Sequence, residues 1–227
     1  MLSAIDQDRI AEAVTKAEEG SSGEIVCALA GEVSTYREVP LAWAAAVTLA
    51  VPPIALALGV QPLTAGGGGL WMIAQASAVE WQLTLALGLY AAMQIVLFLI
   101  VALVVHVPAV RRVLTPRTLK AHRVAKAAQH QFAAVSARAV GSDTGVLIFV
   151  ALEDRQVQVL ADAAIHQKCG DAVWEEAAQA IRGAMRAGKD PTGGIVEAIA
   201  ICGAALREHF PSSEPHAHAF SPRPMEV

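Results

Sequence analysis

Residues 40–60 read PLAWAAAVTLAVPPIALALGV, and residues 81–107 read WQLTLALGLYAAMQIVLFLIVALVVHV. Each run is long enough to cross the hydrocarbon core of a bilayer, which takes about 20 apolar residues as helix. Between Val39 and Val110 the only formal charge is on Glu80. The segment 61–80 that joins the runs contains four consecutive glycines and is too short for a domain. The sequence therefore predicts a two-helix transmembrane hairpin, because too little chain remains to bury both helices in a soluble core.

Basic residues flank this hairpin unevenly. Arg37 precedes the first run, and the connecting loop contains no lysine or arginine. A basic cluster follows the second run, made of Arg111, Arg112, Arg117, Lys120, Arg123 and Lys126. Lysine and arginine near the ends of membrane helices tend to stay in the cytoplasm and to contact anionic lipid headgroups. We therefore expect a multi-pass protein of the inner (plasma) membrane, with both termini cytoplasmic and the basic cluster facing the lipid.

Composition limits the partners. The chain has 227 residues, 55% of them hydrophobic, and a formal net charge of −4, which excludes a broadly basic nucleic-acid binder. The expected partners are the lipid bilayer and another membrane protein. The three cysteines, Cys27, Cys169 and Cys202, have no paired spacing, and Cys27 and Cys202 lie in apolar segments, as is typical of free buried thiols. No CxxC, G-x-S-x-G, Walker or GxGxxG pattern is present, so nucleophilic or nucleotide chemistry has little support.

The remaining sequence predicts one domain that is split by the hairpin into residues 1–38 and 108–211. Helical periodicity covers the first 19 residues and 118–138, and two more helices are expected at 171–187 and 192–209. Continuous apolar runs predict buried strands at 24–30 and 144–152, and an alternating run predicts an edge strand at 156–160. A crossover helix makes the first two strands parallel, and a tight turn makes the third antiparallel. The expected fold is α/β, a small mixed β-sheet covered by helices, with residues 212–227 as a disordered tail.

This topology brings acidic residues from separate segments to one end of the sheet. Glu24 and Asp143 begin the two parallel strands, and Asp162 follows the strand that returns to the same end. Three carboxylates converging from separate loops form a candidate site for a divalent cation such as calcium or magnesium. Such a cation can activate water for phosphoester hydrolysis. The alternative is that these are acidic residues at strand ends that simply face solvent.

Several segments together resemble the TPM domain family. They are SSGEIV at 21–26, TGVLIFV at 144–150, the following turn and edge strand, Val173-Trp174, and 193–210. The resemblance implies a TPM-like α/β/α fold and points to the branch of bacterial membrane-anchored proteins with a membrane hairpin inside the domain. The family includes a thylakoid-lumen protein of photosystem II repair, and its members are described as acid phosphatases, divalent-metal binders or accessory subunits. Many members place the domain outside the cytoplasm, whereas the charges here predict the cytoplasmic side.

Function stays open between three hypotheses. The first is a membrane-anchored accessory or interaction domain. The second is a divalent-metal-dependent phosphatase, although the glycine-containing loop of the family is replaced here by the sequence ADAAI at 161–165. The third is a subunit of a membrane or envelope complex. Transport is disfavoured, because neither apolar run carries an ionisable residue at mid-depth.

Overall fold

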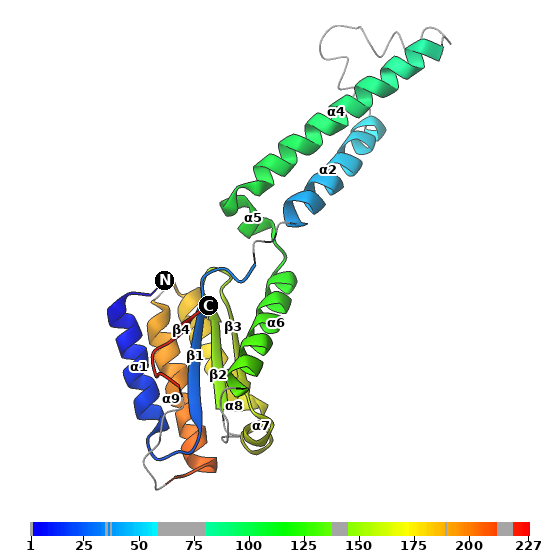
Figure 1. Cartoon of the computed structure of the whole chain (residues 1–227). Helices are drawn as coiled ribbons and strands as arrows, with labels where there is room; N and C mark the ends of the chain where they lie inside the picture. Colours follow the sequence, from blue (N-terminus) through cyan, green and yellow to red (C-terminus); the bar gives the residue numbers. More distant parts are fainter. Residues whose placement is uncertain are drawn as a thin grey trace. The chain divides into compact units, whose positions relative to one another are not determined.

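A computed structural model describes residues 2–34, 36, 38–58, 80–137, 145–188, 190–212 and 220–227. The chain divides into two compact units (Figure 1). The first unit joins Met1–Thr35 to Arg117–Val227, and the second is Tyr36–Pro116. The division therefore falls nine residues beyond the boundary that the sequence suggested at residue 108.

The first unit contains a four-stranded sheet in the order β3-β2-β1-β4. Its strands are β1 (Glu24–Ala30), β2 (Gly145–Ala151), β3 (Gln156–Ala161) and β4 (Met225–Glu226). β1 pairs with β2 in parallel, with Glu24 opposite Gly145, and β2 pairs with β3 antiparallel. The prediction of a small mixed sheet is confirmed, and the first two strands lie within a residue of their expected bounds.

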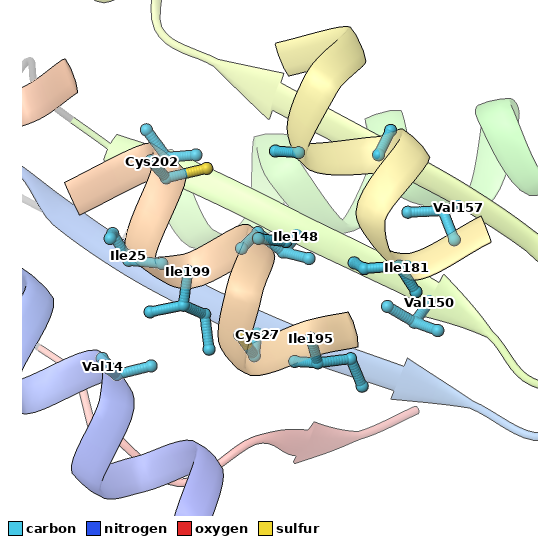
Figure 2. Packing of buried hydrophobic residues seen from close by; sticks show 14 of the residues in the cluster. Val14, Ile25, Cys27, Ile148, Val150, Val157, Ile181, Ile195, Ile199 and Cys202 are labelled. Carbon is cyan, nitrogen blue, oxygen red and sulfur yellow. The ribbon is translucent and has the colours of Figure 1, made fainter. Parts of the chain in front are cut away.

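Helices cover both faces of this sheet (Figure 1). One face packs on α1 (Ala4–Glu18), α7 (Ala163–Cys169), α8 (Asp171–Arg186) and α9 (Pro191–His209). The other face packs on α6 (Arg117–Ser136) alone among the described helices. Figure 2 shows the first of these layers, where Ile148 of β2 and Ile199 of α9 belong to one buried apolar cluster. Because side chains alternate along a strand, β1 and β2 bury apolar residues on both faces, which explains their continuous apolar sequence.

The start and the end of α1 are fixed by polar side chains. Ser3 Oγ accepts a hydrogen bond from the Asp6 backbone N–H at 3.2 Å, and the Asp6 carboxylate accepts one from the Ser3 N–H at 3.3 Å. This capping box was expected from the Ser-x-x-Asp spacing, and its hydrogen bonds with Ser3 lower the pKa of Asp6. At the other end, the buried Glu18 accepts a hydrogen bond from the Ile25 N–H at 2.7 Å. The helix is thereby tied to β1, the strand it precedes.

The second unit contains the two apolar helices, α2 (Glu38–Ala57) and α4 (Glu80–His106), and the short helix α5 (Pro108–Leu114). The helices α2 and α4 are both long and apolar enough to cross a membrane. In α4 only 6% of the window Leu87–His106 is buried, whereas the core helix of a soluble protein would be mostly covered. Within this unit, Trp43 Nε1 donates a hydrogen bond to the Leu114 carbonyl oxygen at 3.2 Å. The predicted glycine loop lies outside the described residues.

The C-terminal tail differs from its prediction. Residues 213–219 lie outside the described part of the chain, but residues 220–227 return to the sheet, where β4 pairs in parallel with β1. The Val227 N–H donates to the Leu29 carbonyl oxygen at 2.9 Å, and Arg223 forms an ion pair with Asp8 at 2.6 Å. The expectation of a disordered tail is therefore wrong for its last eight residues, because backbone pairing holds them on β1 and the ion pair with Asp8 holds them on α1.

Candidate functional site

Two of the three predicted acidic residues lie at the same end of the sheet. Glu24 Oε1 accepts a hydrogen bond from the Phe220 N–H at 2.7 Å, and Asp162 Oδ2 accepts one from the Gly145 N–H at 2.6 Å. Gly145, the first residue of β2, lies opposite Glu24 of β1. Asp162 follows β3, the strand on the other side of β2, so the two carboxylates lie on either side of Gly145. Asp143, the third member of the predicted set, lies outside the described residues.

Glu24 and Asp162 line one small cavity on the α6 side of the sheet. Its other walls include Phe132, Val135 and Phe220, and its volume is about 10 Å³. A cavity of that size holds about one water molecule or a bare ion. It is too small for a phosphoryl group with its ester.

The electrostatics of this cavity favour a cation. Val135 and Ser136 close α6 and line the cavity, so the C-terminal end of that helix points its partial negative charge toward it. Carboxylate oxygens are the ligands that calcium and magnesium prefer. The donor set of Glu24 and Asp162 therefore fits a hard divalent cation chemically. Within the described ranges, no three histidine, cysteine, aspartate or glutamate residues come together as a metal-binding group.

The acidic residue Asp154, at the opposite end of the sheet, has a structural role. Asp154 is buried, and its Oδ2 accepts a hydrogen bond from the Val33 N–H at 3.3 Å. Arg155 completes the β2–β3 turn with a φ of 51°, a left-handed conformation that shapes the hairpin. These residues hold the chain where it leaves β1 for the second unit.

The predicted lipid-facing basic cluster is not a uniform exposed surface. Arg111 is buried, and Arg123 donates a hydrogen bond to Ser34 Oγ. Arg117 and Lys126 are exposed on α6, and Lys120 is half-buried. The side chain of Arg112 is outside the described part. Arg111 is buried although the sequence suggested an exposed position, because a charge count does not distinguish a buried basic residue from an exposed one. Contact of the cluster with lipid stays a prediction.

Phe220 is the residue of this site that sequence reasoning missed. Its N–H donates a hydrogen bond to Glu24, and the residue lines the cavity. The only sequence signal was an aromatic residue within a polar, proline-containing tail.

The three cysteines are free, as expected, and burial raises the pKa of Cys202 to about 12. That thiol stays protonated and unreactive near neutral pH.

Comparisons with known proteins agree with this architecture. The family model of the TPM domain matches residues 109–205. The NMR structure of the BA42 protein from the psychrophilic bacterium Bizionia argentinensis is similar over 100% of this chain and 96% of its own, with a TM-score of 0.54. Its sequence identity to this chain is 17%, so this likeness concerns the fold alone. No curated protein matches the sequence. Residues 109–205 thus match the TPM domain, and the mixed sheet covered by helices agrees with a TPM-like fold.

Proposed function

We propose that the protein is a TPM domain anchored in a membrane by a helical hairpin, where it serves as an accessory domain for another membrane protein. The observation that carries this proposal is the placement of α2 and α4. Two helices long and apolar enough to span a bilayer interrupt the domain between β1 and α6. Both ends of the interruption return to the same compact unit, so the hairpin anchors the domain at two points of its chain.

Anchoring fits the hairpin better than transport does. The charged residues of α2 and α4 are Glu38 and Glu80, each at the first position of its helix. Ionisable residues inside membrane helices mark substrate and ion pathways, and neither helix carries one at mid-depth. The most polar contact described in α4 is the hydrogen bond from Gln94 Nε2 to Tyr90 OH at 3.1 Å, within a single helix. The exposed apolar side chains of α4, such as Leu99 and Leu103, suit lipid or a partner's membrane helix.

The proposed topology places both termini in the cytoplasm and the glycine loop outside the inner membrane. Gly67→Cys, made in a chain whose native cysteines are replaced by alanine, is expected to react with a membrane-impermeant maleimide added to intact cells. A cysteine introduced at Ser213 in the same background is the matched control, and we expect it to react only after the cells are opened. Labelling of the tail and protection of the loop in intact cells would show that the orientation is inverted. Extraction of the protein by alkaline carbonate would contradict the anchor itself.

A second candidate function is divalent-cation binding at the acidic end of the sheet. Glu24 and Asp162 would hold calcium or magnesium, which would neutralise two carboxylates gathered beside the C-terminal end of α6. The small volume of the cavity favours a cation that stabilises the fold over one that activates water for hydrolysis of a bound substrate. A metal-dependent phosphatase, the enzymatic alternative, would need its phosphoester to bind outside this cavity.

Calcium or magnesium at millimolar concentration is expected to raise the melting temperature of the full chain in detergent micelles. A ligand that binds only the folded state adds about 2.7 kcal/mol of stability at a hundredfold excess over its Kd. Asp162→Asn removes one of the two charges and should abolish the metal-induced rise. Asp154→Asn, at the opposite end of the sheet, is the control and should leave the rise intact. An unchanged wild-type melting temperature in both metals would mean that these acids bind no cation.

A further inference from the structure

The free edge of β3 is a row of backbone groups that point away from the sheet. The Asp162 N–H donates to the Gly145 carbonyl oxygen at 3.0 Å, and the Leu152 N–H donates to the Ala30 carbonyl oxygen at 2.9 Å. In an antiparallel ladder, backbone hydrogen bonds alternate between the partner strand and the outside. These two bonds fix the alternation so that the N–H and C=O groups of Val157, Val159 and Ala161 face outward. No hydrogen bond to these groups is present among the described residues.

Nothing in the sequence of β3 protects this edge. Natural proteins usually block an edge strand with lysine, proline, a bulge or an inward-pointing charge. The strand reads QVQVLA, without a charged residue or a proline, and pairs with β2 in unbroken register over six residues. An uncharged and regular edge is a template for another extended strand.

A groove lies along this edge. β3 forms its floor, Trp174, Ala178 and Arg182 of α8 stand on one side, and Ala121 of α6 contributes on the other. Its volume is about 740 Å³, within the range of roughly 300–1,000 Å³ that encloses bound ligands. Four of the lining residues are alanines, Ala121, Ala161, Ala163 and Ala178, and their small side chains leave room for the side chains of an added strand. Trp174 is 6% exposed, and its indole N–H has no acceptor among the described residues.

The charges on the rim indicate which strand would fit. Glu175 pairs with Arg182 at 2.9 Å, and Asp171 pairs with His166 at 2.8 Å. The rim carries two carboxylates, on Asp171 and Glu175, and one guanidinium, on Arg182. His166, which is 53% exposed, adds no formal charge when histidine is counted as neutral, so the rim carries more negative than positive formal charge. A segment with basic residues beside its apolar part would complement this rim.

We propose that the β3 edge binds an extended segment of a partner protein as a fifth strand, with alternating aliphatic side chains flanked by lysine or arginine. This inference rests on the proposed function as an accessory domain and names the surface that holds the partner. A single strand is the preferred occupant because α6 and α8 contact β3 on its opposite faces and their residues line the groove along its edge. A second folded copy would bring its own two helices against these walls.

The test uses the full chain in detergent micelles and a fluorescent peptide of alternating threonine and valine with two lysines at each end. We expect the peptide to bind and to slow hydrogen exchange of the Val157, Val159 and Ala161 amides by about tenfold or more at saturation. Val159→Pro removes one outward-facing N–H without breaking the ladder to β2, and should weaken binding by about tenfold or more. Val159→Ala is the matched control, because it loses side-chain packing but keeps the N–H and should bind like the wild type.

Three results would overturn the inference. They are unchanged exchange of the three amides in the presence of peptide, equal peptide binding by Val159→Pro, and peptide-free dimers that Val159→Pro converts to monomers. A peptide with glutamates in place of the lysines should bind more weakly at low salt, and equal binding would refute the charge argument. Peptide binding does not depend on membrane orientation, so failure of the topology labelling leaves this test intact, and failure here leaves the anchor in place.

Discussion

A chain that begins at Pro108 is expected to aggregate instead of folding. That fragment keeps β2, β3 and the helices of residues 117–209, but it loses α1 and β1. β1 lies between β2 and β4, so its removal strips the backbone partner from seven residues of β2 and from β4 at once. It also exposes Leu147, Ile148 and Phe149, which are at most 1% exposed in the whole domain. A long, apolar, unpaired strand is a strong template for aggregation.

The matched control keeps β1 and removes only the hairpin. In it, residues 1–34 are joined to residues 117–227 by a flexible glycine-serine linker of about ten residues, which has a reach of roughly 17 Å. Ser34 accepts a hydrogen bond from Arg123, less than two helical turns from Arg117, so this linker spans the gap. We expect the linked chain to elute as a soluble species with one cooperative melting transition. A Pro108 fragment that is monomeric and melts cooperatively would contradict the split domain.

The strands at the centre of the fold were predictable because a strand that is buried on both faces has a continuous apolar sequence. The run EIVCALA at 24–30 became β1, and residues 145–151 became β2, each apolar on both faces because helices cover both sides. The antiparallel return of β3 followed from the short polar segment at 153–155. In these segments local sequence and tertiary burial agree, which is the condition for reading a fold from sequence.

The parts that sequence reasoning missed are held by long-range contacts. β4 has two residues, too few for periodicity, and its place depends on pairing with Ala28 and Leu29 of β1. α7 is a single short helix that begins at Ala163, the third residue of ADAAI, and ends at Cys169, where the family resemblance implied a loop. The candidate site shows the same limit. The predicted topology placed Glu24 and Asp162 at one end of the sheet. Phe220 could not be predicted from local sequence patterns, because it lies almost 200 residues from Glu24 in the sequence.

Gly203→Ala is expected to destabilise the domain strongly, although alanine is the better helix former. Gly203 faces α1 inside α9, and a Cβ there would lie 2.6 Å from the Ala17 Cβ and 2.8 Å from the Ala17 carbonyl oxygen. Backbone atoms cannot rotate away, so the helices must separate, which also strains the hydrogen bond from Arg207 Nη1 to the same carbonyl at 3.1 Å. Overpacking typically costs about 1–3 kcal/mol, and helix propensity returns up to about 1 kcal/mol. A clash with backbone belongs at the upper end of that cost, so we expect the melting temperature to fall by roughly 4–8 °C.

Gly193 in the same helix provides the control. A Cβ at Gly193 meets nothing within 4 Å, so Gly193→Ala should gain helix propensity without a clash and raise the free energy of unfolding by up to about 1 kcal/mol. Ala17→Gly in the Gly203→Ala background should restore part of the lost stability, since it removes the Cβ at 2.6 Å but leaves the carbonyl at 2.8 Å. Thermal unfolding of the full chain in detergent micelles, followed by circular dichroism, measures all three variants. If Gly203→Ala melts at or above the wild-type temperature, the close packing of α1 on α9 is not a feature of the folded domain.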